Sequence, residues 1–147
     1  MRDTLAPRMQ NFRDRCVELG MPLTHQRLVI YEALASTDEH PTPEAVFERV
    51  RKKIPSISLA TVYKNIRSFA DAGLLREVSL LHESLRLDAN LADHHHLVCE
   101  RCKSVTDLPH DALAPVRMKI NPPDRFQVHR FNVEVLGLCA RCAATDS

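Results

Sequence analysis

Cysteines and histidines are the residues of this 147-residue chain whose types and spacing could perform metal chemistry. Four of the five cysteines form two CxxC pairs, CERC (99–102) and CARC (139–142), separated by residues 103–138. Each pair follows an apolar, β-prone stretch, and each tight turn places two sulfurs about one tetrahedral edge apart. Two such turns make a closed four-thiolate site, which suits Zn²⁺. We therefore predict structural zinc on Cys99, Cys102, Cys139 and Cys142.

Two other chemistries remain open for the CxxC pairs. A thioredoxin-like redox pair would sit in a βαβ pattern, and neither pair does so. Disulfides are disfavoured in the cytoplasm. We expect a cytoplasmic protein, because no apolar run approaches the roughly 18 residues that span a bilayer and MRDTLAPRMQ has no signal-peptide core. Cys16 stands alone on an apolar helix face and is expected in the core.

A second set of ligands begins with DHHHLVCERC (93–102). If residues 94–98 form a strand, His94 and His96 share one face and His95 takes the other. The chain turns at 99–102 and returns as SVTDL (104–108), so antiparallel pairing would bring Asp107 to the face of His94 and His96. Two imidazoles and a carboxylate would then converge.

Asp88, at the end of the predicted hairpin, is close enough in sequence to join this set. His40 could join it if the helical half folds against the strands. Three imidazoles and two carboxylates suit Fe²⁺, Mn²⁺, Ni²⁺ or Zn²⁺ about equally by ligand type. A surface histidine cluster that holds no metal is the alternative. The remaining histidines considered are expected to be solvent-exposed: His25, His82, His95 and His110.

The first half of the chain, to about residue 76, is predicted to be helical. Apolar residues recur at helical spacing before a stop at Gly20: Leu5, Met9, Phe12, Cys16 and Leu19. Thr24, Thr42-Pro43 and Ser58 are typical helix starts. The helix that begins at Thr42-Pro43 is expected to include Ile54. The helix that begins at Ser58 and ends at Gly73 is expected to turn four side chains inward: Leu59, Val62, Ile66 and Phe69. REVSL (76–80) and LRLDA (85–89) then predict a hairpin around residues 82–84.

Short helices followed by a β-hairpin are the outline of a winged helix, in which the helix before the hairpin enters the DNA major groove. The outward face of the helix at 58–70 has no acid before Asp71 and carries cations and polar groups: Thr61, Tyr63, Lys64, Asn65, Arg67 and Ser68. Such a face can approach phosphates and base edges. A solvated surface helix is the alternative, and the net charge of +1 neither indicates nor excludes nucleic acid.

The second half, from about residue 90, is predicted to be strand-rich, with a short helix at 111–120 and strands at 94–98, 104–108 and 131–138. Apolar residues make up 44% of the chain but aromatics only 5%, which makes a thin core here. About 60 residues of this kind need a metal, a partner chain or both.

These residues resemble the ferric uptake regulator superfamily over nearly the whole chain. The similar stretches are LTHQRLVIYEAL (23–34), EHPTPEAVF (39–47), SLATVYKNIRSFADAGLL (58–75), DHHHLVCERCKSVTDL (93–108) and VEVLGLCARC (133–142). The resemblance implies an α+β fold, with a winged-helix DNA-binding domain (1–86), a hinge (87–92) and a dimerisation and metal-binding domain (93–147). It implies a homodimeric repressor that binds a palindromic operator in double-stranded DNA and carries structural zinc.

The chain is most similar to the peroxide-responsive branch of that superfamily. In this branch a His-Asp-His-His-Asp set holds a regulatory Fe²⁺ or Mn²⁺, and it falls here on His40, Asp88, His94, His96 and Asp107. Iron-sensing members typically have glutamates at the two aspartate positions, and Phe131 stands where a third site would need a histidine. The resemblance implies that hydrogen peroxide is the signal and that it oxidises His40 or His94 when Fe²⁺ is bound. The implied DNA contacts are Gln26, Arg27, Tyr63, Lys64, Asn65 and Arg67, to which the outward face adds Thr61.

Two other functions stay open at this point. A repressor that senses the level of iron, zinc, nickel or manganese could use the same five ligands. A metallo-hydrolase could use a His/Asp cluster with an open coordination position, but the chain has neither HExxH nor HxE followed by PCxxC. We therefore expect no enzymatic activity.

Overall fold

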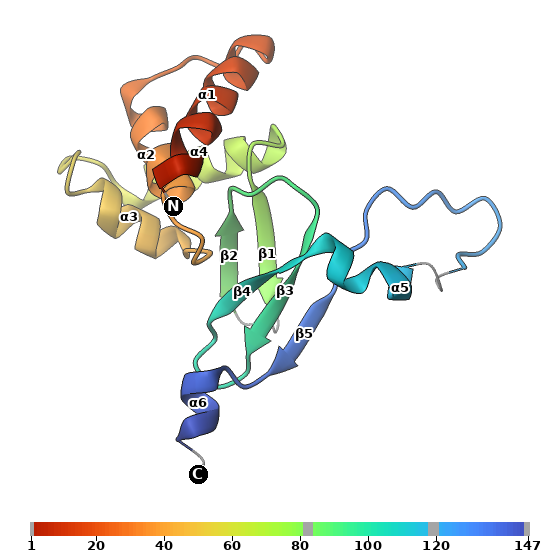
Figure 1. Cartoon of the computed structure of the whole chain (residues 1–147). Helices are drawn as coiled ribbons and strands as arrows, with labels where there is room; N and C mark the ends of the chain where they lie inside the picture. Colours follow the sequence, from red (N-terminus) through yellow and green to blue (C-terminus); the bar gives the residue numbers. More distant parts are fainter. Residues whose placement is uncertain (1, 81–83, 118–120, 146–147) are drawn as a thin grey trace. The chain divides into compact units, whose positions relative to one another are not determined.

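The computed structural model describes residues 2–80, 84–117 and 121–145. The chain forms two compact units, Met1–Leu91 and Ala92–Ser147 (Figure 1). No helix in the described ranges is both long enough and apolar enough to cross a membrane.

The first unit has the predicted order of helices followed by a hairpin. Its elements are α1 (Arg2–Glu18), α2 (His25–Ala35), α3 (Pro43–Val50), α4 (Leu59–Asp71), β1 (Arg76–Leu80) and β2 (Ser84–Asp88). β1 and β2 pair antiparallel, with Arg76 opposite Asp88. The tip of the hairpin, including His82, lies outside the described residues. The α+β winged-helix outline is therefore confirmed for this unit.

Side chains at the predicted helix starts fix where α2, α3 and α4 begin. Thr24 accepts a hydrogen bond from the backbone N–H of Arg27, and Thr42 accepts one from Ala45. Ser58 likewise accepts from Thr61. Each bond satisfies one of the N–H groups that a helix leaves without an internal partner at its first turn.

Glycines end α1 and α4 in the same way. Gly20 and Gly73 have φ of 64° and 71°, the left-handed region that glycine adopts without a steric penalty. After Gly73, the N–H of Leu74 bonds to the carbonyl of Phe69 at 2.8 Å, and after Gly20 the N–H of Met21 bonds to that of Cys16 at 2.8 Å. These bonds reverse the chain and return it to the core.

An aromatic cluster forms the centre of the first unit. The ring of Phe12 stacks on Tyr31 with centroids 4.0 Å apart, and Phe69 meets both rings edge-on. Cys16 is fully buried beside them, as predicted. The prediction for Leu59 is wrong, because its side chain is 37% exposed. It is the first residue of α4, and the buried face of that helix begins only at Val62.

The second unit is built on a three-stranded sheet with the order β4-β3-β5 (Figure 1). β3 (His94–Cys99) pairs antiparallel with β4 (Val105–Pro109) and parallel with β5 (Glu134–Gly137). The predicted helix at 111–120 is shorter: a 3-10 turn (His110–Leu113) leads into α5 (Ala114–Arg117), and residues 118–120 are not described. Pro115 fits only the first turn of a helix, so α5 starts anew beside it.

The core of the second unit is thin, as its composition predicted. Its buried apolar residues, within the described ranges, are Val98, Cys99, Val105 and Cys142. Two of these four are cysteines of the CxxC pairs. The α6 helix (Ala140–Ala144) follows β5 and carries the second pair into this region.

Candidate metal centres and DNA-reading helix

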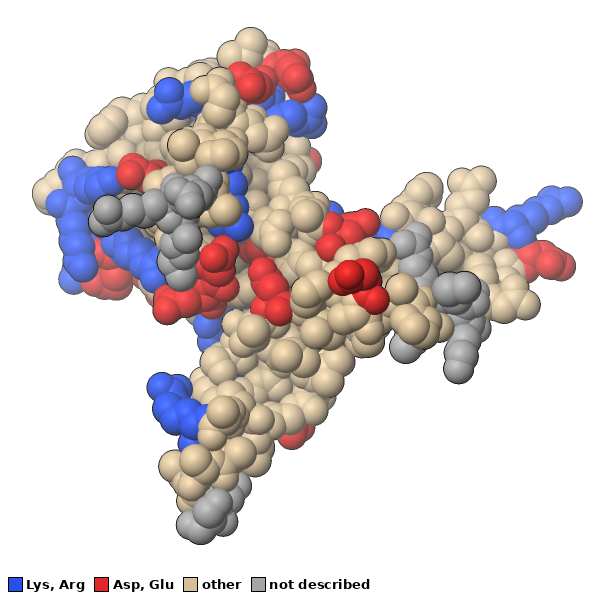
Figure 2. All heavy atoms as spheres, in the orientation of Figure 1, with Lys and Arg blue, Asp and Glu red and all other residues tan. Residues whose placement is uncertain are grey.

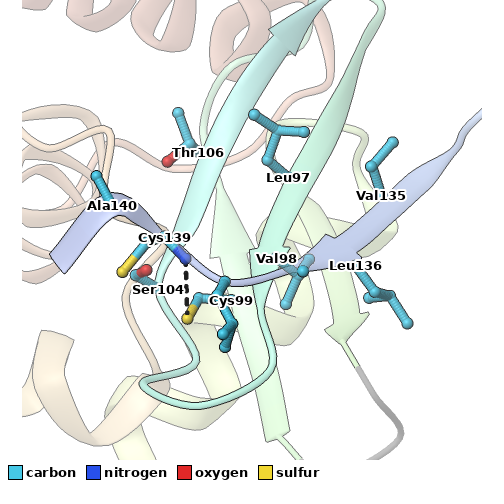
Figure 3. A pocket seen from close by; sticks show the side chains of 11 residues that line it. Leu97, Val98, Cys99, Ser104, Thr106, Val135, Leu136, Cys139 and Ala140 are labelled. Carbon is cyan, nitrogen blue, oxygen red and sulfur yellow. Dashed lines mark hydrogen bonds between the residues drawn. The ribbon is translucent and has the colours of Figure 1, made fainter. Parts of the chain in front are cut away.

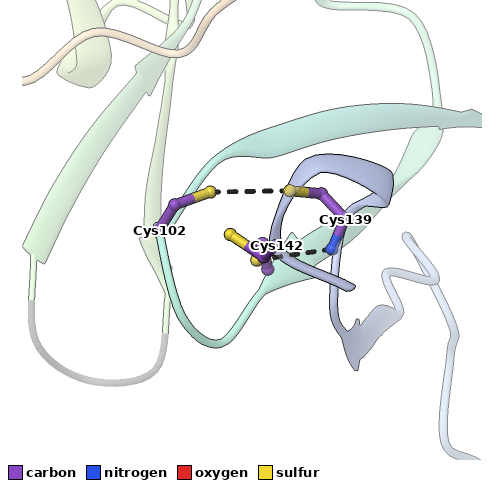
Figure 4. A group of neighbouring side chains, drawn as sticks. Cys102, Cys139 and Cys142 are labelled. Atoms are coloured by element: carbon purple, nitrogen blue, oxygen red, sulfur yellow. Dashed lines mark hydrogen bonds between the residues drawn. The ribbon is translucent and has the colours of Figure 1, made fainter. Parts of the chain in front are cut away.

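Four sulfur atoms meet where the two CxxC pairs approach each other. Figure 4 shows three of these cysteines, Cys102, Cys139 and Cys142. Cys99 ends β3, Cys102 lies in the turn after it, and Cys139 and Cys142 lie at the start of α6 and within it. One atom of each residue lies within 4.8 Å of the others, and the sulfurs of Cys102 and Cys139 are 3.8 Å apart. These are free thiols, because a disulfide needs sulfurs about 2.05 Å apart. The donor set fits a tetrahedral Zn²⁺.

Backbone groups position the sulfurs before any metal is considered. The N–H of Cys139 donates to the sulfur of Cys99 at 3.4 Å (Figure 3), and the N–H of Lys103 closes the first CxxC turn onto the carbonyl of Cys99 at 2.9 Å. Hydrogen bonding to Ser104 lowers the pKa of Cys102 to about 5. Burial raises the pKa of Cys142 to about 12. A metal ion that binds here must displace the Cys142 proton, so its affinity falls as the pH falls.

His40 and Asp88 form a buried pair within the first unit. His40 Nε2 and Asp88 Oδ2 are 3.2 Å apart, and both residues are at most 5% exposed. The N–H of Asn90 donates to the other oxygen of Asp88 at 2.8 Å, which orients the carboxylate. The N–H of Leu87 donates to the carbonyl of Pro41 at 3.0 Å, so β2 holds the His40 loop beside Asp88.

The backbone of His40 has a φ of 54°, in the left-handed region. A residue with a Cβ pays about 1–3 kcal/mol to stay there. Glycine adopts such a φ without penalty, and asparagine, aspartate and histidine adopt it more often than other side chains. Strained backbone of this kind clusters at functional sites, which motivates a role for the His40 imidazole.

In the second unit, two imidazoles and a carboxylate lie together across β3 and β4. His96 is directly opposite Asp107 in the strand register, as the pleat and the turn predicted. Asp107 Oδ1 lies 3.4 Å from His94 Nε2 and 3.8 Å from His96 Nε2. His94 Nδ1 donates to the carbonyl of Ala92 at 2.6 Å. This bond puts the proton on Nδ1 and leaves the lone pair on Nε2, the tautomer that suits a metal ligand.

The prediction that His95 is exposed is wrong, because its side chain is fully buried on the opposite face of β3. Its ring packs on His110 and Phe131, with centroids 5.5 and 5.4 Å away, and its Nδ1 accepts the N–H of Val133 at 3.1 Å. Burial lowers the pKa of His95, which keeps it neutral. His110 is half-buried, not exposed, while His25 is exposed as predicted. Strand alternation correctly predicts the face of β3 on which His95 lies. It does not predict that other residues cover that face.

The predicted DNA-reading face of α4 differs in detail from its sequence pattern. Tyr63, Lys64 and Arg67 are exposed, whereas Thr61 and Asn65 are half-buried. On α2, Gln26 is exposed, and Arg27 donates from Nε to Asn65 Oδ1 at 3.3 Å.

One acidic side chain does reach the α4 surface, from another helix. The Tyr63 hydroxyl donates to the carboxylate of Glu44, which lies in the first turn of α3. The lack of acidic residues in α4 before Asp71 therefore does not mean that no negative charge lies beside this helix. A contact between α3 and α4 has no local signal in the sequence, so Glu44 was missed.

A basic run at the end of α3, RVRKK (49–53), is a poorer candidate for phosphate contacts than its sequence suggests. Arg49 pairs with Glu39 at 3.4 Å, and Arg51 pairs with Glu48 at 2.8 Å. Lys53 also pairs with an acid, Glu32 on α2. Figure 2 shows cations and acids adjoining where Figure 1 places α3. These charges largely neutralise one another, so this surface offers phosphates little net attraction.

Comparisons with known proteins agree on one family. The model of the ferric uptake regulator family matches residues 18–136. The peroxide-responsive repressor PerR of Staphylococcus epidermidis is 33% identical over 123 residues, which cover 84% of this chain and 82% of that protein. The peroxide operon regulator of Bacillus subtilis is 32% identical over 130 residues, covering 88% and 90%.

A solved structure gives the same result for the fold. The crystal structure of the Campylobacter jejuni peroxide stress regulator superposes with a TM-score of 0.70 at 27% sequence identity. The match covers 90% of this chain and 97% of that one. The similarity therefore extends over both units and is not confined to the helices.

Proposed function

The chain belongs to the ferric uptake regulator family, and from that premise we propose that it is a peroxide-responsive repressor. Members of this family are metal-responsive transcriptional regulators and not enzymes, which removes the hydrolase alternative. The peroxide-responsive function is supported by relatives of that name at 31–33% identity. We infer a cytoplasmic location from the same family membership.

The observation that carries the proposal is the convergence of His94, His96 and Asp107 on one face of β3 and β4. We propose that one Fe²⁺ or Mn²⁺ ion takes these three ligands together with His40 and Asp88. The hinge would lie within residues 87–92. Such an ion would favour one relative orientation of the two units only by the difference in its affinity for the alternatives.

Structural zinc is proposed on Cys99, Cys102, Cys139 and Cys142. The four-sulfur cluster supports it, and so does the thin core of the second unit. Four ligands close the coordination shell, so this metal would stabilise the fold and take no part in sensing.

The proposed signal is hydrogen peroxide. Bound Fe²⁺ would supply the one-electron chemistry that converts peroxide into an oxidant of a ligand imidazole, whereas Mn²⁺ would not. His40 and His94 are the proposed targets. In each residue Nε2 lies beside a carboxylate oxygen, 3.2 Å from Asp88 in His40 and 3.4 Å from Asp107 in His94, so one ion could bind both atoms. Oxidising either ring would remove a donor from the set and so weaken the grip on the metal.

On the DNA side, we propose that α4 reads a palindromic operator as part of a homodimer. The proposed contacts are those predicted from the sequence: Gln26, Arg27, Thr61, Tyr63, Lys64, Asn65 and Arg67. The outward-facing cations of α4 support this role, because Lys64 and Arg67 project from one exposed surface.

The exposed apolar surface of the second unit is where we propose that two copies meet. Leu97 on β3 lies opposite Val135 on β5 in the strand register, and the two are 39% and 41% exposed. Figure 3 shows these side chains along a groove that ends at the cysteines. β5 is the edge of the described sheet, so its outer backbone groups can pair with a second chain.

Operator release by peroxide tests the proposal. The dimer is loaded with Fe²⁺ or with Mn²⁺, bound to an operator duplex and treated with hydrogen peroxide. We expect release only from the Fe²⁺ form, with the gain of one oxygen atom on a peptide that contains His40 or His94. Equal insensitivity of both forms would rule out peroxide sensing and favour the alternative, a repressor that senses the level of a metal.

A further inference from the structure

Glu44 and Tyr63 link α3 to the surface of α4. The Tyr63 hydroxyl donates to a Glu44 carboxylate oxygen at 2.5 Å. The bond lowers the pKa of Glu44 and raises the pKa of Tyr63, so the acceptor is charged and the donor keeps its proton around neutral pH. Thr42 and Pro43 fix the start of α3, and a carboxylate in the first turn of a helix is favoured by the helix dipole. The position of Glu44 is therefore set by its own helix.

The bond determines what Tyr63 can offer to DNA. A phenol has one proton to donate and lone pairs that accept. Because that proton is engaged in the hydrogen bond to Glu44, Tyr63 can present only its ring and an oxygen lone pair to DNA. A phosphate offers only acceptors and repels the nearby carboxylate. Base edges in the major groove offer amino groups and the thymine methyl, which suit a lone pair and a ring.

The side chains next to Tyr63 on α4 fall into two groups, those hydrogen-bonded within the protein and those exposed to solvent. The side-chain amide of the half-buried Asn65 is hydrogen-bonded within the protein, because its Oδ1 accepts from Arg27 at 3.3 Å and its Nδ2 donates to the carbonyl of Thr61 at 2.9 Å. Lys64 and Arg67 are exposed, and no acidic group in the described part of the chain forms an ion pair with either. The α4 face thus has two cations suited to phosphates beside one aromatic side chain whose donor is occupied.

We infer that Glu44 is a specificity-determining positioning residue, which holds the Tyr63 hydroxyl so that this side chain meets base edges and not phosphates. The inference rests on the proposed role of α4 in reading DNA. Glu44 itself lowers affinity for every duplex through its charge, and it raises the preference of the protein for its operator over other sequences.

Four variants separate the charge of Glu44 from its hydrogen bond. The Mn²⁺-loaded dimer is measured against a duplex that the wild type selects from a random pool and against a shuffled duplex of equal length and composition. Glu44→Ala should lower the ratio of the two affinities about 3- to 10-fold, the effect of one net hydrogen bond. Glu44→Gln keeps an acceptor and should preserve the ratio while binding both duplexes more tightly. With Tyr63→Phe as the background, Glu44→Ala should change the ratio less than twofold.

An alkaline absorbance titration of the wild type, with Tyr63→Phe subtracted, reports the bond without DNA. The pKa of Tyr63 should fall toward its ordinary value of about 10 in Glu44→Ala. An unchanged affinity ratio in Glu44→Ala overturns the inference, whether or not that pKa falls. Lys64→Ala and Arg67→Ala should weaken binding to both duplexes. If neither does, or if the wild type selects no sequence, the proposed role of α4 fails and the inference fails with it.

Discussion

The backbone of His40 allows its strain and its proposed metal binding to be measured separately. Its φ of 54° costs a residue with a Cβ about 1–3 kcal/mol. His40→Ala removes the imidazole but keeps this cost. His40→Gly removes both, and its extra freedom in the unfolded chain takes back about 0.5–1 kcal/mol. The glycine variant should therefore be more stable than the alanine variant by about 1 kcal/mol, or about 3 °C in Tm for a chain of this size.

The same two variants should behave alike toward the regulatory metal. With Mn²⁺ at about 100 times its dissociation constant, the wild type should gain about 2.7 kcal/mol in free energy of unfolding. Both variants should gain much less at that concentration, because each lacks the donor that faces Asp88. Neither should bind the operator in response to Mn²⁺, although both should remain folded dimers.

Urea unfolding of the zinc-replete protein, with and without Mn²⁺, measures both effects, and operator binding is followed by fluorescence anisotropy. Tyr31→Phe is a suitable control, since it alters a buried residue of the same unit outside the proposed ligand set. If the glycine variant is no more stable than the alanine variant, the backbone strain at position 40 is not real. If either variant gains as much from Mn²⁺ as the wild type, His40 is not a ligand.

Three further perturbations test other parts of the proposal. Cys139→Ser, or removal of zinc by a chelator, should unfold the second unit and abolish dimers. Circular dichroism should show that the first unit keeps its helices, and a folded dimer without zinc would contradict a structural role. Val135→Lys should weaken the dimer at least about 10-fold in sedimentation analysis. Asn132→Lys, at an exposed position outside β5 that does not line the groove of Figure 3, should not, and equal behaviour of the two variants would place the interface elsewhere. Lys64→Ala should reduce the slope of log affinity against log salt by about 1 if it contacts a phosphate, and an unchanged slope would exclude that contact.

The elements that local chemistry dictates could be predicted from the sequence. Thr24, Thr42 and Ser58 cap helices as predicted, because a hydroxyl three residues before an N–H needs no tertiary help. The approach of Asp107 to His96 is also local, since it follows from strand alternation and one tight turn. The two CxxC pairs belong to the same class, because each turn fixes its own sulfurs.

The contacts that the sequence did not reveal all join segments distant along the chain. The burial of His95 depends on Val133 and Phe131, which reach β3 only through the parallel pairing of β5. Glu44 meets Tyr63 because α3 packs beside α4, and no spacing within either helix encodes that contact. In both cases the sequence identifies the residue, but it does not reveal which distant residue packs against it.

The proposed regulatory ligands show the same division between local and distant contacts. His94, His96 and Asp107 are brought together by one hairpin, so the second unit can present them whatever the first unit does. His40 and Asp88 depend on the bonds that join the His40 loop to β2, including that of Leu87 to Pro41. Neither group alone offers more than three donors. A single ion that takes ligands from both groups would bind tightly only when both groups are available to it. If the metal raises the affinity of the protein for its operator by some factor, the operator must raise the affinity of the protein for the metal by the same factor.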